Sequence, residues 1–319
     1  MSKYTRYPYT TVATLDITKE VMLIDHLNGF DSDKNNLILE TLNNRARALG
    51  NICSVRYHNL LDEDVVKKYN NLSFVFDAKL QNLLNLSGLK TYKIHPEINF
   101  KNFVCSFNGG LHIGRTLLTA ILHRYKWFDP KYSSKNFQST TDNTYGHLAD
   151  NLSTTQLQFY DKFFQIDAEF HSSVYHFSYN KTQSDRNNLY ALENKLANSF
   201  VHIVSETMAT SYHPFITEKF LYSIVTRGLF LAYAQPGWHD HVETYYGFKK
   251  YTKLFDYRFD TILNPIERLI ELMCMISKFS VLSCHDWHDL YLIEQDTIEY
   301  NYDHYFSGDY LKYLTAHGQ

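Results

Sequence analysis

Apolar residues in this chain fall into short runs, and strand-like runs alternate with helical ones. In the N-terminal third, strands are expected at residues 20–27, 52–57, 72–76 and 91–95. Helices are expected between them at residues 37–49, 62–69 and 80–86, with Gly50 as the stop of the first helix. Strands and helices that alternate in this way indicate βαβ units around a parallel sheet, and hence an α/β fold.

The alternation continues after Pro96, which suits a junction between domains. Further strands are expected at residues 100–108, 200–204 and 229–233, and helices from near Arg115, at 189–196 and from 217. A longer amphipathic helix is expected at residues 266–282, with Leu269, Leu272, Met273 and Ile276 facing inward. Residues 129–160 are polar and lack apolar spacing, so we expect a long surface loop there.

Chain length and charge narrow the class of protein. A chain of 319 residues is long enough for one large or two medium domains with ample core. We expect domains at residues 1–97 and 98–282, followed by a tail at 283–319 that packs back on them. The formal net charge of −3 gives no global signature of nucleic-acid or membrane binding, although it does not exclude a local basic patch.

Cysteine usage and hydropathy bear on location. The four cysteines are scattered and form no CxxC pair, which fits a reduced, cytoplasmic interior. No run of about 18 apolar residues is present, so we expect no membrane span. The first residues lack the apolar core of a signal peptide. A cytoplasmic location is therefore the expectation.

The stretch at residues 215–230 is the strongest candidate for a ligand site. Its Thr217-Glu218-Lys219 triplet predicts a helix start with Thr217 as the N-cap. Unpaired backbone N–H groups in such a first turn favour anionic ligands. Glu218 would suit sugar hydroxyls and Lys219 a phosphate. The alternative is a capped helix whose charged residues are merely solvated.

A second candidate follows the strand at residues 100–108. Residues 109–114 carry three glycines, and Arg115 comes near the start of the next helix. A glycine-bearing loop between a strand and a helix lets backbone N–H groups approach a phosphate closely, and Arg115 could hold a diphosphate with two parallel hydrogen bonds. The spacing fits neither of the common nucleotide-binding glycine motifs, so a plain tight turn is the alternative.

Acidic residues at strand ends complete the candidates. Asp25 and Asp77 follow strands in the N-terminal third, and Glu206 follows the strand at 200–204. Ligands of parallel sheets bind beyond the carboxyl ends of the strands, which makes these three acids candidates. Asp25 and Asp77 have the alternative role of capping their loops.

Two histidine-rich segments resemble metal sites at first inspection. They are His239-Asp240-His241 and residues 284–289, CHDWHD. An oxygen and nitrogen set of this kind would suit a divalent ion, but the spacing matches no structural zinc pattern. We expect ordinary loop histidines and acids, and no metal.

Three segments, in order, resemble the nucleotide-binding half of the fucosyltransferase-type glycosyltransferases, carbohydrate-active family ten. They are residues 103–122 (FVCSFNGGLHIGRTLLTAIL), 125–137 (YKWFDPKYSSKNF) and 199–220 (SFVHIVSETMATSYHPFITEKF). Residues 228–248 resemble the strand and Pro/Gly loop that follow in that family. The match covers roughly residues 100–250, and the Thr217-Glu218-Lys219 triplet is its most specific part.

The resemblance implies a GT-B fold, in which two Rossmann-like domains face each other across a cleft. Residues 1–97 would form the acceptor-side domain and residues 98–282 the nucleotide-sugar domain. The reaction would be an inverting, metal-independent transfer from a nucleotide-diphosphate sugar, with no other cofactor required. Carried over by position, the donor-binding residues would be Asn108, Arg115, Glu206, Glu218 and Lys219. Asp77, or else Asp25, would be the catalytic base.

The acceptor stays open between two classes. The resemblance favours a glycan, whereas a composition heavy in Asn, Lys, Ile and Tyr is compatible with a viral enzyme of the host cytoplasm that glycosylates a hydroxymethylated base in DNA. Lys249, Lys250 and Lys253, or Lys67 and Lys68, would then contact phosphates. A non-catalytic nucleotide- or sugar-binding module is the remaining alternative.

Overall fold

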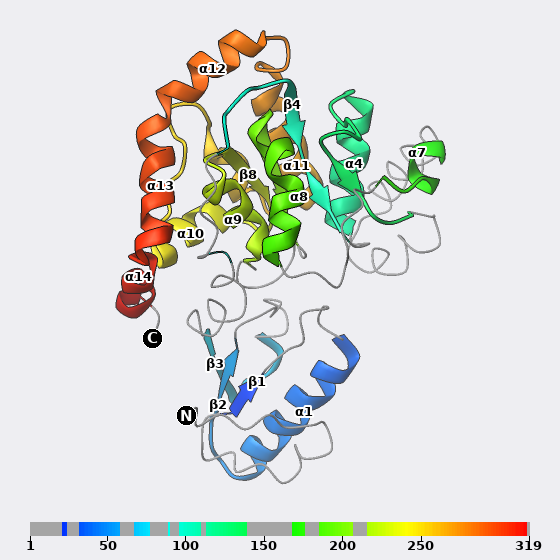
Figure 1. The fold of residues 1–319 in the computed structure, drawn as a ribbon. Coiled ribbons are helices and arrows are strands. Elements are labelled where there is room, and N and C mark those ends of the chain that lie inside the picture. Colours follow the sequence, from blue (N-terminus) through cyan, green and yellow to red (C-terminus); the bar gives the residue numbers. More distant parts are fainter. Residues whose placement is uncertain are drawn as a thin grey trace.

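The chain has a mixed α/β fold with parallel sheets, which confirms the predicted fold class at that level (Figure 1). The computed structural model describes residues 21–23, 32–57, 67–76, 89, 96–109, 113–138, 168–175, 185–206 and 216–317. The strands in these ranges form one sheet near the N-terminus and a second group after Pro96.

The N-terminal sheet is parallel and has the order β1-β2-β3. Its elements are β1 (Val21–Leu23), α1 (Ser32–Ala48), β2 (Cys53–Tyr57) and β3 (Leu72–Phe76). Helix α1 packs on β2 and β3 through Leu39, Leu42 and Ala46, and Gly50 follows it at φ 65°. All four predicted elements are confirmed. The other predicted elements, at 80–86, 91–95 and most of 62–69, lie outside the described residues.

The second group of strands is also parallel throughout. Its strands are β4 (Asn102–Cys105), β5 (Phe107–Asn108), β6 (Ser134–Lys135), β7 (Ser199–Ser205) and β8 (Leu229–Tyr233). Strand β7 lies between β4 and β8, and β5 pairs with β6. Because only Ser106 separates β5 from β4, the strands run side by side as β6, β4/β5, β7 and β8.

The connections leave the middle of this array in opposite directions. Helix α4 (Ile113–Arg124) leads from β5 to β6, whereas α9 (Glu218–Val225) leads from β7 to β8 on the other side. Right-handed crossovers of this kind place the two helices on opposite faces. In agreement, α4 packs against α7 (Ala168–Ser172) and α9 packs against α8 (Asp185–Ala197). The adjacent ends of β5 and β7 therefore form a topological switch point.

The sequence predicted β4 and β5 as one strand and missed β6. The chain breaks at Ser106, whose hydroxyl donates to the Ile203 carbonyl. Strand β6 lies in the segment predicted to be a surface loop, yet Ser134 and Lys135 are buried. The prediction was wrong there because the buried side chains are polar. The rest of that segment, from residue 139, lies outside the described residues.

Lys135 is buried because backbone carbonyls replace its water. Its ammonium donates to the carbonyl oxygens of Phe137, His171 and Ser173 at 2.7, 3.0 and 2.8 Å. Burial lowers the pKa of Lys135 to about 8. The three hydrogen bonds connect β6 to α7, and they occupy all three N–H donors of the Lys135 ammonium.

Helices after β8 complete the domain. They are α10 (Trp238–Tyr246), the 3-10 helix η2 (Tyr257–Thr261), α11 (Pro265–Ser277), α12 (Cys284–Ile293), α13 (Gln295–Ser307) and α14 (Tyr310–His317). Helix α11 buries Leu269, Leu272, Met273 and Ile276, as predicted. Helices α12, α13 and α14 pack on β7, α9 and α10, respectively. Among the described helices, none has the length and apolarity needed to cross a membrane.

The interior of this region is rich in aromatic contacts. The Trp287 ring of α12 stacks on Phe200 and Phe103, with ring centroids 5.8 and 5.7 Å apart. Every residue of β7 and β8 is buried. Each large ring buries a large apolar area, so these contacts hold β4, β7 and α12 together.

A close contact between His202 and Gly228 locks β7 against the turn that precedes β8. His202 Nε2 donates to the Leu196 carbonyl at 2.9 Å, and Nδ1 accepts from the Ser223 hydroxyl at 3.0 Å. Burial lowers the pKa of His202 to about 4, so the ring is neutral near pH 7. A Cβ atom on Gly228 would lie 2.0 Å from His202 Cε1. Only glycine fits there.

Gly228→Ala should therefore lower the free energy of unfolding by about 3 kcal/mol, since the buried ring has nowhere to move. Gly50→Ala is the control. Its Cβ would meet no atom within 4 Å, and the positive φ of 65° costs about 1 kcal/mol. The double variant Gly228→Ala/His202→Ala should be more stable than Gly228→Ala alone, because removing the ring removes the clash. Denaturant titrations measure the free energy of unfolding of each variant. Equal losses in the two glycine variants would contradict the contact.

Candidate ligand-binding site at the strand ends

The start of α4 lies against the end of β8. Gly114 is buried, and a Cβ there would lie 3.3 Å from Cε1 of Tyr233, the last residue of β8. Arg115 follows it and is 5% exposed. The first turn of α4 contains no acidic residue. The positive end of the helix dipole and Arg115 together make this helix start electropositive.

The start of α9 is tied to the ends of β7 and β8. Thr217 caps α9, and its hydroxyl accepts from the Lys219 backbone N–H at 3.4 Å. The Thr217 backbone N–H donates to Glu206 Oε1 at 3.1 Å, and the Glu206 N–H donates to the Tyr233 carbonyl at 3.1 Å. Both helix starts thus contact the same edge of the sheet. Lys219 is half-buried there, with Nζ 3.4 Å from Thr217 Oγ1.

A row of polar side chains crosses the strands at this edge. Asn108 pairs in register with Lys135, and Ser205 with Tyr233. Past the break at Ser106, an extrapolation of the Cys105–His202 pairing puts Asn108 near the level of Ser205. Residues directly opposite one another in a parallel sheet point to the same face. Lys135 reaches α7 and Tyr233 reaches α4, so Asn108 and Ser205 point to this same side.

Two buried atoms of this row have unused hydrogen-bonding capacity. The Asn108 amide nitrogen donates to Ser106 Oγ and to the Ser134 carbonyl, both at 3.1 Å. Asn108 Oδ1 and Ser205 Oγ find no hydrogen-bond partner among the described residues. Buried polar atoms are usually paired, and exceptions concentrate at sites that hold a water, an ion or a ligand. The row therefore supplies neutral polar groups beside the two cationic helix starts.

The structure brings most of the predicted donor-site residues to one sheet edge. Asn108 and Arg115 lie on the connection that leaves β5, and Glu206 and Lys219 on the one that leaves β7. Glu218 is the first residue of α9, and its side chain lies outside the described part of the structure. The distance between the Arg115 and Lys219 side-chain ends stays a prediction.

The predicted catalytic acids, Asp25 and Asp77, lie outside the described residues, as do residues 110–112 of the glycine loop. The sequence analysis missed Ser205 and Tyr233 as members of the edge. Both end strongly apolar strands, and the first polar or aromatic residue after such a run could have marked them.

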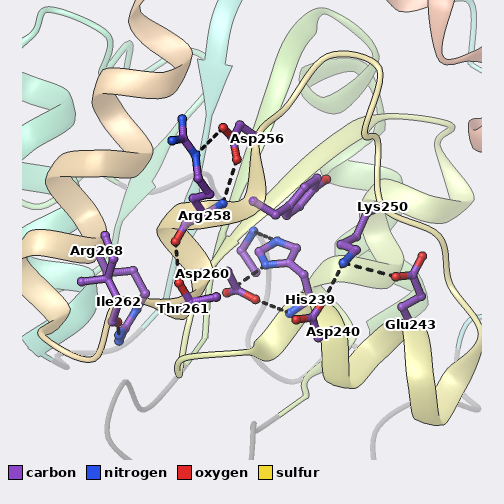
Figure 2. A network of polar contacts seen from close by, with 12 residues as sticks. His239, Asp240, Glu243, Lys250, Asp256, Arg258, Asp260, Thr261, Ile262 and Arg268 are labelled. Atoms are coloured by element: carbon purple, nitrogen blue, oxygen red, sulfur yellow. Dashed lines mark hydrogen bonds and ion pairs between the residues drawn. The ribbon is translucent and has the colours of Figure 1, made fainter.

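Both histidine segments lie in helices, in α10 and α12, and the expectation of loop histidines was wrong; Figure 2 shows His239 of the first segment. His239 and Asp260 are buried together, with Nδ1 and Oδ1 3.0 Å apart. His239 Nε2 accepts from the Ala232 backbone N–H at 3.0 Å, and the His239 backbone N–H donates to Asp260 Oδ2 at 2.9 Å, so this histidine is held within the fold. On α12, exposed His285 and Asp289 are 3.9 Å apart. No group of three metal-binding side chains occurs in the part of the chain that the structure describes.

Comparison with known proteins adds no relative from which a role could be transferred. No family model matches this chain, and no curated protein or solved structure shows significant similarity to it.

The Glu206 side chain links the end of β7 to the start of α9, which yields a stability test. Glu206→Ala removes the acceptor of the buried Thr217 N–H and should lower the free energy of unfolding by roughly 1–3 kcal/mol. Glu206→Gln keeps an acceptor oxygen and should lose less. Chemical denaturation of both variants checks this, and an alanine variant as stable as the glutamine variant would show that the contact is dispensable.

Proposed function

We propose that this protein is a glycosyltransferase that moves a sugar from a nucleotide-diphosphate sugar to an acceptor hydroxyl. The observation that carries the proposal is the switch point of the second group of strands. There, two helix starts, each followed by a cationic side chain, contact one edge beside Tyr233 and Glu206. In open parallel sheets, ligands bind at such points, outside the carboxyl ends of the strands.

A diphosphate fits this edge on electrostatic grounds. Arg115 and the start of α4 offer one set of N–H donors, and Lys219 and the start of α9 offer another. Negative charge grows on the leaving diphosphate during sugar transfer, and positioned cations stabilise that charge without needing to reorganise. The same clamp can take the place of a metal ion, so we propose a metal-independent, inverting reaction.

Other parts of the donor would meet the remaining polar groups. Glu218, in the first turn of α9, would bind the ribose hydroxyls, and the row containing Asn108 would line the pocket together with Glu206. These assignments follow the resemblance to the fucosyltransferase-type enzymes. They are supported by the confluence of Asn108, Arg115, Glu206 and Lys219 at one edge.

The acceptor side belongs to the N-terminal third in this proposal. Its three parallel strands, β1 to β3, would form the core of a second Rossmann-like domain, as in GT-B enzymes. Asp77 follows β3 directly, and Asp25 follows β1 by two residues. Either carboxylate at such a strand end would suit a general base that takes the proton from the acceptor hydroxyl. The acceptor would be a glycan or, as the second choice, a hydroxymethylated base in DNA.

A non-catalytic nucleotide- or sugar-binding module is the alternative. It uses the same edge and differs in having no turnover. Donor hydrolysis measured without an acceptor separates the two, because a binding module releases no nucleotide.

Thermal melts with a panel of nucleotide-diphosphate sugars test the proposal. A matching donor at about 100 times its dissociation constant should add about 2.7 kcal/mol of stability. Arg115→Ala and Lys219→Ala should abolish this protection and lower turnover roughly 100-fold or more. Arg124→Ala, on the last turn of α4, and exposed Lys101→Ala are the matched controls.

Since Arg115 is buried, its replacement by alanine could also unfold the protein. Circular dichroism of each variant reports whether the fold is intact, and Arg115→Lys keeps the positive charge at this position. Protection that survives in folded Arg115 and Lys219 variants would contradict the site assignment. Absence of protection by every sugar nucleotide would contradict the function.

A further inference from the structure

A pocket lies beside the loop that joins α10 to η2, away from the candidate donor site at the strand ends. Its volume is about 420 Å³. It is lined by Lys250, Thr252, Lys253, Leu254, Phe255, Asp256, Tyr257 and Lys278. Three of these side chains are cationic and one is anionic. The pocket is large enough for a phosphate group together with part of the molecule that carries it.

Two charged side chains of this lining, Lys250 and Asp256, contact oppositely charged side chains outside it (Figure 2). Lys250 Nζ contacts the carboxylates of Asp240 and Glu243, the latter at 3.3 Å. Asp256, the one anion of the lining, accepts from the backbone N–H and from Nε of Arg258, at 3.0 and 2.6 Å. These contacts leave Lys250 and Asp256 each paired with residues outside the pocket lining.

The other two lysines of the lining, Lys253 and Lys278, contact a backbone carbonyl and an aromatic ring. Lys253 Nζ donates to the Ile293 carbonyl at 2.9 Å, and Lys278 Nζ lies 4.8 Å from the centre of the Phe279 ring. Neither ammonium contacts a carboxylate among the described residues. Both lysines therefore line the pocket without a close ion pair, although Lys278 interacts electrostatically with Asp256, and three cationic side chains against one anionic one suit a ligand that carries negative charge.

The loop that carries Lys253 is held in place from inside. Glu294 is fully buried, and its Oε1 accepts from the backbone N–H groups of Lys253 and Leu254 at 2.6 and 3.1 Å. Asn301 holds Lys249 in the same loop, accepting from its N–H at 2.8 Å and donating to its carbonyl at 2.9 Å. A backbone fixed in this way reduces the conformational entropy that a ligand must remove on binding.

We propose that this pocket binds a phosphate group, with Lys253 and Lys278 as its cationic contacts and the Thr252 hydroxyl as a further donor. The phosphate could belong to a small molecule or to a nucleic-acid backbone, since both present the same oxygens. The site lies on the loop after α10, whereas the donor site is assigned to the connections after β5 and β7. Binding of a small phosphorylated compound is therefore independent of the glycosyltransferase proposal, whereas binding of a nucleic acid would also fit its DNA-acceptor alternative.

Two binding measurements on the double variant Lys253→Ala/Lys278→Ala test the inference. In the first, inorganic pyrophosphate is titrated against the protein by calorimetry. In the second, binding of a labelled DNA duplex is followed by anisotropy at several salt concentrations. Lys101→Ala/Lys312→Ala is the control, because it removes the same charge elsewhere on the surface. Lys253→Arg/Lys278→Arg keeps the charge and should keep binding.

The inference predicts that the alanine pair weakens pyrophosphate binding about tenfold or more. If the phosphate is part of a nucleic acid, the same pair also lowers the slope of log K against log salt by about 1–2, one for each lost phosphate contact. Loss in the pyrophosphate arm alone assigns the pocket to a small phosphorylated compound. If the alanine pair and the control pair behave alike in both arms, the inference is wrong.

Discussion

The arrangement of the second group of strands depends on one constraint of chain direction. From the adjacent ends of β5 and β7, the chain must turn to opposite sides to reach β6 and β8. The two connecting helices then start at the same edge but lie on opposite faces, so their electropositive ends are brought together by topology. Glu206 reinforces this by joining the end of β7 to Tyr233 of β8 and to Thr217 of α9.

Close packing converts this topology into defined positions. The His202 ring fills the space over Gly228, and the Tyr233 ring lies against Gly114. The first contact requires a glycine just after α9, whereas at the start of α4 a Cβ would be tight against the Tyr233 ring, at 3.3 Å. The Lys135 ammonium is consumed by three carbonyls on the same side of the array. Arg115 and Lys219, near the starts of α4 and α9, are therefore the cations that we propose for the edge.

Much of the fold could be predicted from the sequence because the strands and amphipathic helices bury apolar side chains, and the spacing of apolar residues is visible in the sequence. Strands β3 and β8 and the inward residues of α11 are examples. Strand β6 could not be predicted, since Ser134 and Lys135 are buried by hydrogen bonds that only the folded chain provides. Helices α13 and α14 carry many Tyr and His residues, whose mixed polar and apolar character hides the helical period. The candidate site residues were chosen by their positions after strands, but the pairing of Asn108 with Lys135 and of Ser205 with Tyr233 depends on strand register, which the sequence alone does not give.

A crystal structure of the protein with a nucleoside diphosphate tests the central claim most directly. The account predicts the diphosphate at the switch point, with the Arg115 guanidinium and the Lys219 ammonium each about 3 Å from its oxygens. A structure in which these two groups face different solvent surfaces, with the diphosphate bound elsewhere, would contradict it.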